Sequence, residues 1–203
     1  MLRRPWAWLV FALLMLVPPA VLLVERRRVE APPDFGPVPG FQLVSHEGAS
    51  FSASDLTGKV VVLDFIFTRC PDVCPVMTTQ MVALQRALPE HPFGGPKLHL
   101  VSVSVDPTHD TPPVLSAYAD KYGADLSHWT FLTGTQVDVD TLSEGLAQAL
   151  VTRPGAEGDA PDITHSQRML LLDPNGHVRG FFPTDEEGLA ALVDAIEGIA
   201  LEQ

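Results

Sequence analysis

An almost unbroken run of apolar residues from Val60 to Phe67 constrains the fold of this chain more than any other feature. Asp64 is the only polar residue in the run. Such a run, rich in β-branched and aromatic residues, is typical of a strand that is covered on both faces. The spacing of Met77, Met81 and the leucines after them predicts an amphipathic helix next. A buried strand that leads into such a helix predicts a layered α/β domain.

The alternation of strands and helices continues along the chain. Strands are expected at Leu98 to Val105 and at Trp129 to Leu132. Thr111, followed by two prolines, predicts the start of a helix that ends at Gly123, and a further helix is expected near Val139 to Leu150. This order favours a central sheet with parallel strands, flanked by helices.

The C-terminal part departs from this alternation. Met169 to Leu172 and Val178 to Phe182 flank the turn sequence Asp-Pro-Asn-Gly, which predicts an antiparallel hairpin. Thr184, with Glu187 three residues later, predicts the start of a last helix. The expected fold is therefore α/β with a mixed sheet and a C-terminal β-hairpin and helix.

The N-terminal segment predicts a membrane anchor. Residues 5–24 contain no charged side chain, and a helix of about 20 residues spans about 30 Å, the thickness of the bilayer hydrocarbon core. The run is longer than the core of a cleaved secretory signal and lacks an Ala-x-Ala end, which favours an uncleaved anchor; both alternatives imply export. Residues 25–39 are predicted to form a proline-rich tether, and residues 40–203 the domain.

Charge excludes one class of partner. Residues 29–203 carry eight basic and 24 acidic side chains, a net charge of −16. Such a surface repels the phosphates of nucleic acids, so no nucleic-acid partner is expected.

Cys70 and Cys74 are the only cysteines, and any thiol chemistry depends on this pair. A proline follows each cysteine, which places both in the loop between strand and helix. Cys74 is expected at the N-cap with Pro75 as the first helical residue. The partial positive charge of a helix N-terminus then favours the thiolate of Cys74.

This spacing allows either a disulfide or joint coordination of one metal ion. A structural zinc site normally has four protein ligands, whereas two thiolates and one imidazole form a ligand set typical of copper. His109 and His165 are the candidates for the third ligand, because each lies in a loop next to a strand expected beside Cys70. The remaining histidines are expected to be surface or loop residues without a metal-binding role: His46, His91, His99, His128 and His177. Met77 and Met81 are expected in the core, and Asp64 is either a functional acid or a hydrogen-bonded buried carboxylate.

Three segments together resemble the Sco/SenC family of membrane-anchored copper proteins. Residues 64–75, DFIFTRCPDVCP, are similar to the cysteine motif of the family. SVDP at 104–107 with DTP at 110–112 is similar to its second block, and His165-Ser166 ahead of residues 169–173 to its third. The three blocks occur in the family's order over most of residues 40–198.

The resemblance implies a thioredoxin-like fold in which Cys70, Cys74 and His165 bind one copper ion, as Cu(I), Cu(II) or both. The resemblance also implies that the protein helps to assemble the dinuclear copper centre in subunit II of cytochrome c oxidase. Another periplasmic copper carrier would donate the copper to this protein. The same resemblance places residues 1–4 in the cytoplasm and the domain on the periplasmic side of a bacterial cell membrane. Thr164 departs from the aspartate that many relatives have before the histidine, which removes an acid that could orient His165.

Two other functions use the same cysteines. A thiol-disulfide oxidoreductase, which would keep the cysteines of subunit II reduced, needs Cys70 and Cys74 but not His165. A thiol peroxidase of the peroxiredoxin type is disfavoured, because Phe67 stands where those enzymes place a threonine. Copper carriage is the main expectation and thiol redox activity the alternative.

Overall fold

The computed structural model describes residues 31–88, 90–146, 151–153, 162–164 and 168–202. The predicted anchor at residues 5–24, and residues 1–4 before it, lie outside the described residues. Within the described ranges, no helix is long and apolar enough to cross a membrane. Ala31–Gln203 forms one compact unit.

Seven of the described strands form one mixed sheet in the order β2-β1-β5-β4-β3-β8-β9. These strands are β1 (Gln42–Ser45), β2 (Ser50–Ser52), β3 (Lys59–Ile66), β4 (Lys97–Ser104), β5 (Trp129–Thr133), β8 (Arg168–Leu172) and β9 (Val178–Pro183). A separate antiparallel pair consists of β6 (Val151–Arg153) and β7 (Asp162–Thr164). The described helices are α2 (Val73–Ala87), α3 (Pro112–Tyr122), α4 (Gln136–Gly145) and α5 (Glu186–Leu201), with short 3-10 turns η1 (Ala53–Leu56) and η2 (Pro92–Gly94).

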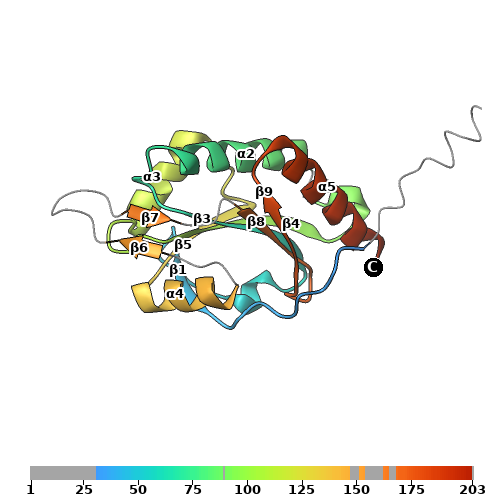
Figure 1. Ribbon diagram of the computed structural model, residues 1–203, viewed down its shortest axis with the longest axis horizontal. Coiled ribbons are helices and arrows are strands. Elements are labelled where there is room, and N and C mark those ends of the chain that lie inside the picture. Colours follow the sequence, from blue (N-terminus) through green and yellow to red (C-terminus); the bar gives the residue numbers. More distant parts are fainter. Residues whose placement is uncertain (1–30, 89, 147–150, 154–161, 165–167, 203) are drawn as a thin grey trace, which may run out of the picture. The chain divides into compact units, whose positions relative to one another are not determined.

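The pairing of the strands decides which loops meet. β3, β4 and β5 are parallel, and their right-handed connections place α2 and α3 on the same face. Figure 1 shows α2, α3 and α5 over one face of the sheet and α4 on the other. β8 runs antiparallel to β3, with Leu170 opposite Leu63, so β8 begins at the edge where β3 ends. The predicted mixed sheet with flanking helices, C-terminal hairpin and last helix is confirmed.

The core is built around β3, in which every residue from Val60 to Ile66 is buried. Met77 and Met81 are fully buried on α2, which confirms them as core residues. The rings of Trp129 and Phe131 stack with their centroids 4.9 Å apart on the neighbouring part of the sheet. Burial of this kind on both faces explains the apolar run in the sequence.

Two helix starts test the predicted caps. α3 begins at Pro112 after the N-cap Thr111 and ends at Gly123, which adopts the left-handed conformation as predicted. The prediction for α5 was wrong by one residue, because the N-cap is Asp185 and not Thr184. The Asp185 carboxylate accepts a hydrogen bond of 2.7 Å from the amide of Gly188, within the first turn of the helix.

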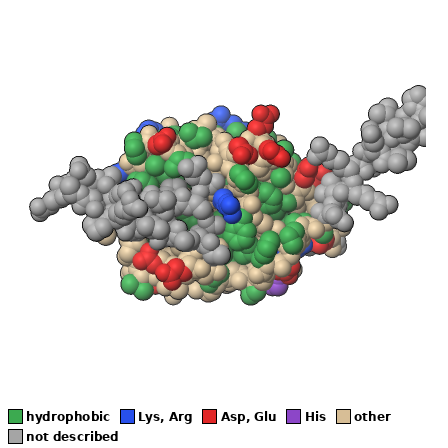
Figure 2. Space-filling model, in the orientation of Figure 1, with side chains coloured by type: hydrophobic (Ala, Val, Ile, Leu, Met, Phe, Trp, Pro, Cys, Tyr) green, Lys and Arg blue, Asp and Glu red, His purple; other side chains and the backbone are tan. Residues whose placement is uncertain are grey.

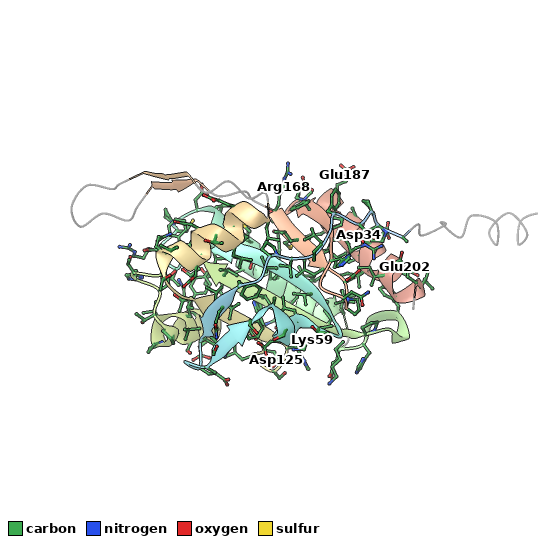
Figure 3. All side chains as sticks on the ribbon, turned by 90° about the horizontal axis from the view of Figure 1, so that it is seen from below. Asp34, Lys59, Asp125, Arg168, Glu187 and Glu202 are labelled. Atoms are coloured by element: carbon green, nitrogen blue, oxygen red, sulfur yellow. The ribbon has the colours of Figure 1, made fainter. Side chains whose placement is uncertain are left out.

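Part of the predicted tether is bound to the domain. Phe35 and Val38 donate backbone hydrogen bonds to the hairpin, at Val178 and Gly176. The guanidinium of Arg179 donates to the carbonyl oxygens of Pro32 and Pro33, and it also contacts carboxylates at the hairpin turn and at the end of α5. Figure 3 shows Asp34 and Glu202 at the same end of the molecule. Residues 32–38 therefore lie against the β8–β9 hairpin and are not a free tether.

Candidate functional site

The two cysteines lie where β3 leads into α2. α2 begins at Val73 after the N-cap Asp72, so the prediction of Cys74 as N-cap was wrong. A turn in which the Cys70 amide donates to the Phe67 carbonyl, at 3.2 Å, brings the chain round early enough for the helix to start one residue before Cys74. Pro75 is tolerated at the third helical position, because amides of the first turn have no helical acceptor.

The two sulfur atoms have different environments. Cys70 is half-buried, Cys74 is fully buried, and no disulfide joins them. The backbone amide of Cys74 donates to Cys70 Sγ at 3.5 Å. Burial raises the pKa of the Cys74 thiol strongly, despite an opposing hydrogen bond from the Phe67 backbone. The predicted thiolate at Cys74 is therefore wrong, since the amide at the start of the helix points to the Cys70 sulfur.

Two aspartates from the loop after β4 contact the residues just before Cys70. Asp110, fully buried, accepts hydrogen bonds from the amide and the hydroxyl of Thr68, at 3.0 and 2.5 Å. The Ser104 hydroxyl donates to the same carboxylate at 2.5 Å. Asp106 forms an ion pair with Arg69, whose Nε and Nη2 lie 3.1 and 2.6 Å from Asp106 Oδ2. The cysteine loop is thus joined to the loop between β4 and α3.

Asp106, His109 and Asp110 also form the one group of at least three His, Cys, Asp or Glu side chains, among those described, that could hold a metal ion. Their ligand atoms lie within 4.8 Å of one another. The Arg69 guanidinium already occupies Asp106, and hydrogen-bond donors surround Asp110. A cation there would meet a positive charge and displace these bonds, so the geometry is that of a hydrogen-bond network.

The histidine candidates differ in what the structure describes. His165 lies outside the described residues, in the sequence between β7 and β8. His109 Nδ1 lies 3.0 Å from Asp110 Oδ1 and 3.4 Å from Thr68 Oγ1, so its ring is held beside the cysteine loop. The other histidines have partners of their own, at Phe131, Gly95, Thr130, Glu90 and Asp34.

His99 is less exposed than its strand pattern suggested. Its Nε2 lies 2.9 Å from the Thr130 hydroxyl on β5. Burial lowers the pKa of His99 to about 4, so the ring is neutral at physiological pH.

Asp64 is a fully buried carboxylate in the middle of β3. Ser102 on β4 donates to Asp64 Oδ1 at 2.6 Å, while Oδ2 has no hydrogen-bond partner among the described residues. Burial raises the pKa of Asp64 to about 7, and the hydrogen bond from Ser102 offsets only part of this effect. A hydrogen-bonded buried carboxylate, one of the two alternatives for this residue, describes this geometry.

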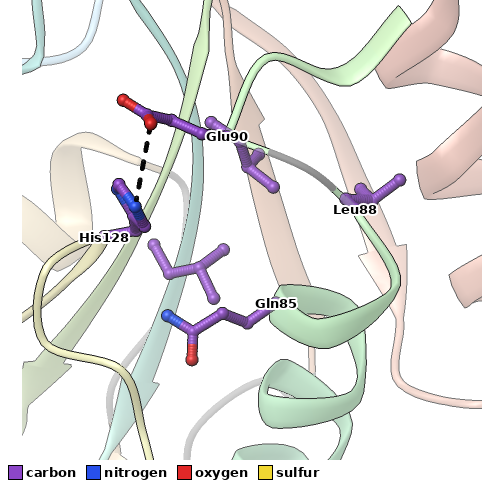
Figure 4. A pocket seen from close by; sticks show the side chains of 6 residues that line it. Gln85, Leu88, Glu90 and His128 are labelled. Carbon is purple, nitrogen blue, oxygen red and sulfur yellow. Dashed lines mark ion pairs between the residues drawn. The ribbon is translucent and has the colours of Figure 1, made fainter.

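A small cavity lies at the opposite end of β4 from the cysteines (Figure 4). Gln85, Leu88, Glu90 and His128 line it, and Glu90 forms an ion pair of 4.0 Å with His128. Its volume of about 20 Å³ accommodates about one water molecule. The cavity is too small for a ligand and is remote from the thiols.

The site and fold together define a class of protein: a thioredoxin-like domain with a dithiol at the start of the helix that follows an interior strand. Comparisons with known proteins agree with this class. The SCO1/SenC family model matches residues 32–200. The SCO1 protein homolog of Bacillus subtilis is 32% identical over 139 residues, which cover 68% of this chain and 69% of the relative.

Solved structures give the same result. The copper-bound structure of Bradyrhizobium japonicum ScoI matches with a TM-score of 0.65 and 27% identity, over 76% of this chain and 96% of ScoI. BsSco, described as a member of the Sco family of cytochrome c oxidase assembly proteins, matches with a TM-score of 0.71 and 28% identity, over 87% of this chain and 100% of BsSco. The chain belongs to the SCO1/SenC family.

Proposed function

We propose that this protein is a copper metallochaperone that binds one copper ion through Cys70, Cys74 and His165. The observation that carries the proposal is the pair of cysteines where β3 leads into α2, in which Cys70 Sγ lies 3.5 Å from the backbone amide of Cys74. Half-buried Cys70 offers copper an entry point, and Cys74 supplies a second sulfur from below the surface. Soft thiolates select Cu(I), and an added imidazole nitrogen also accommodates Cu(II).

The sheet register supports His165 as the third ligand. Leu170, five residues after His165, pairs with Leu63, seven residues before Cys70. Two strands that pair antiparallel bring the residues before one and after the other to the same edge of the sheet. The five residues from His165 to Leu170 and the seven from Leu63 to Cys70 are long enough for the imidazole to reach the sulfurs.

Copper is the cargo of this site, and the chain's own groups handle the protons. Both thiols must lose their protons to coordinate the metal, and the protons return when the metal leaves. Burial of Cys74 favours its protonated form, which assists release of copper to an acceptor with stronger ligands.

The acceptor in this proposal is the dinuclear copper centre of cytochrome c oxidase subunit II, and the donor is a further periplasmic copper carrier. Residues 5–24 would anchor the protein in a bacterial cell membrane by a single span, with the domain in the periplasm. Acidic side chains gather over α4 and α5 on the face that Figure 2 shows. Basic contacts on a partner would complement them.

A thiol-disulfide oxidoreductase that keeps the cysteines of subunit II reduced is the second candidate. One observation favours it: Cys70, whose Sγ accepts a hydrogen bond from the Cys74 amide, is the more accessible of the two cysteines and can be reached by a disulfide of a partner. Cys70 would attack a disulfide in the partner, and Cys74 would resolve the mixed disulfide by displacing the partner's thiolate. This chemistry does not involve His165.

Titration of the reduced full-length protein with Cu(I) tests the proposal. Binding is expected to saturate at about one equivalent of copper, because the chain has one pair of cysteines. A His109→Ala variant, which removes the imidazole held by Asp110, should keep that stoichiometry. Failure of the wild-type protein to bind copper saturably would contradict copper carriage and leave the redox alternative.

A further inference from the structure

The loop that carries Cys70 is held by side chains of the loop after β4. Phe67 to Asp72 lead from β3 into α2, and a backbone hydrogen bond fixes the turn at Cys70 within this stretch. Thr68 and Arg69 are held from outside, by side chains of the loop after β4. The two contacts lie directly before the reactive sulfur in the sequence.

The contact at Thr68 is buried and uses two groups. Both its amide and its hydroxyl donate to Asp110, so the backbone and the side chain of Thr68 are fixed together. Asp110 is completely inaccessible to solvent. Hydrogen bonds to a desolvated carboxylate are among the strong ones in proteins, and leaving such an acceptor unpaired is costly.

The contact at Arg69 is both an ion pair and a pair of directed hydrogen bonds. Two nitrogens of the guanidinium approach the same oxygen of Asp106, while the Thr108 hydroxyl donates to the other oxygen at 3.0 Å. The Asp106 side chain is 4% exposed and that of Arg69 33% exposed. The pair therefore holds the loop more firmly than a pair in full contact with water would.

We propose that Asp106 and Asp110 are positioning residues for the dithiol, which hold Arg69 and Thr68 so that Cys70 Sγ stays beside Cys74. The inference rests on the proposed role of the cysteine pair and adds the residues that set its properties. A thiol that is already held near its partner loses little conformational freedom when the disulfide forms. Asp106 and Asp110 therefore make the disulfide more favourable relative to the dithiol.

Within this protein, the redox step involves only the sulfurs of Cys70 and Cys74. Oxidation forms one bond between Cys70 Sγ and Cys74 Sγ, and two electrons and two protons leave the thiols. Glutathione disulfide in the buffer accepts them and becomes two glutathione thiols. Because the chain has no other cysteine, the oxidised fraction reports on this pair alone.

The test measures the midpoint potential of the copper-free, full-length protein in glutathione buffers, with the thiols trapped at each point. Asp106→Asn and Thr68→Val are each expected to lower the equilibrium constant for disulfide formation about tenfold, which raises the potential by about 30 mV. Thr68→Ser keeps the hydroxyl and should restore the wild-type potential.

Asp173→Asn is the matched control. Asp173 is also a buried aspartate paired with an arginine, Arg179, but it lies at the hairpin turn beside the start of β3. Loss of the Asp173 carboxylate should lower the stability of the fold but change the equilibrium constant for disulfide formation less than twofold. If Asp106→Asn and Thr68→Val also stay within twofold of wild type, or stabilise the disulfide, the inference is wrong. The measurement contains no copper, so a failure of copper binding does not affect it.

Discussion

Replacement of His165 by alanine is expected to lower the affinity for copper more than about 100-fold while the thiols stay active. Loss of a group that only orients a metal ligand lowers affinity about 10- to 100-fold, and loss of the ligand itself should exceed that. Reduction of a disulfide substrate uses Cys70 and Cys74 and should continue at the wild-type rate. Competition with a Cu(I) chelator and a disulfide reduction assay on one preparation measure both quantities.

Two further variants serve as controls for the His165→Ala result. Cys70→Ser together with Cys74→Ser should abolish both copper binding and disulfide reduction, because both need the sulfurs. His109→Ala should still bind about one equivalent of copper, because its imidazole is not the proposed ligand. In cells, oxidase assembly should fail with His165→Ala if copper carriage is the function. Full assembly with that variant would favour the redox alternative.

Asp64→Asn is expected to stabilise the protein increasingly as the pH rises from about 4 to about 7. The pKa of Asp64 is about 7 in the folded protein against 3.8 in the unfolded chain, so the folded state retains the proton longer. Ionisation therefore removes stability across this window, by on the order of 4 kcal/mol in total. Below the window both states are protonated, and above it both are ionised, so the effect is constant.

Chemical denaturation of both proteins at a series of pH values measures this difference. The amide of the Asp64→Asn variant cannot ionise, so the gain in unfolding free energy over wild type should grow up to about pH 7 and then level off. Asp173→Asn should lower stability at neutral pH instead, since it removes the pair with Arg179. A constant difference between Asp64→Asn and wild type over the whole range would contradict the raised pKa.

The sequence predicted the fold wherever periodicity was strong. The apolar run at Val60 to Phe67 became the buried β3, and the Asp-Pro-Asn-Gly turn became the β8–β9 hairpin. Its predictions were less accurate where a polar residue next to the predicted cap could also cap the helix, as Asp185 does in place of Thr184. The order of residues 32–38 was not predicted, because it depends on Arg179, far away in the sequence.

The position of the cysteines could be predicted from the flanking prolines, but their protonation could not. Cys74 is fully buried in the first turn of α2, and this desolvation outweighs the effect of the helix N-terminus on its pKa. The roles of Thr68 and Arg69 were also missed. The available signal was a pair of aspartates four residues apart, Asp106 and Asp110, directly after a buried strand.

X-ray absorption spectroscopy of the copper-loaded, full-length protein tests the central claim most directly, because it reports the atoms bound to copper. The account predicts two sulfur ligands and one imidazole nitrogen, and loss of the imidazole signal in His165→Ala with both sulfurs retained. A spectrum without imidazole in the wild-type protein, or one that His165→Ala leaves unchanged, would contradict the proposed site.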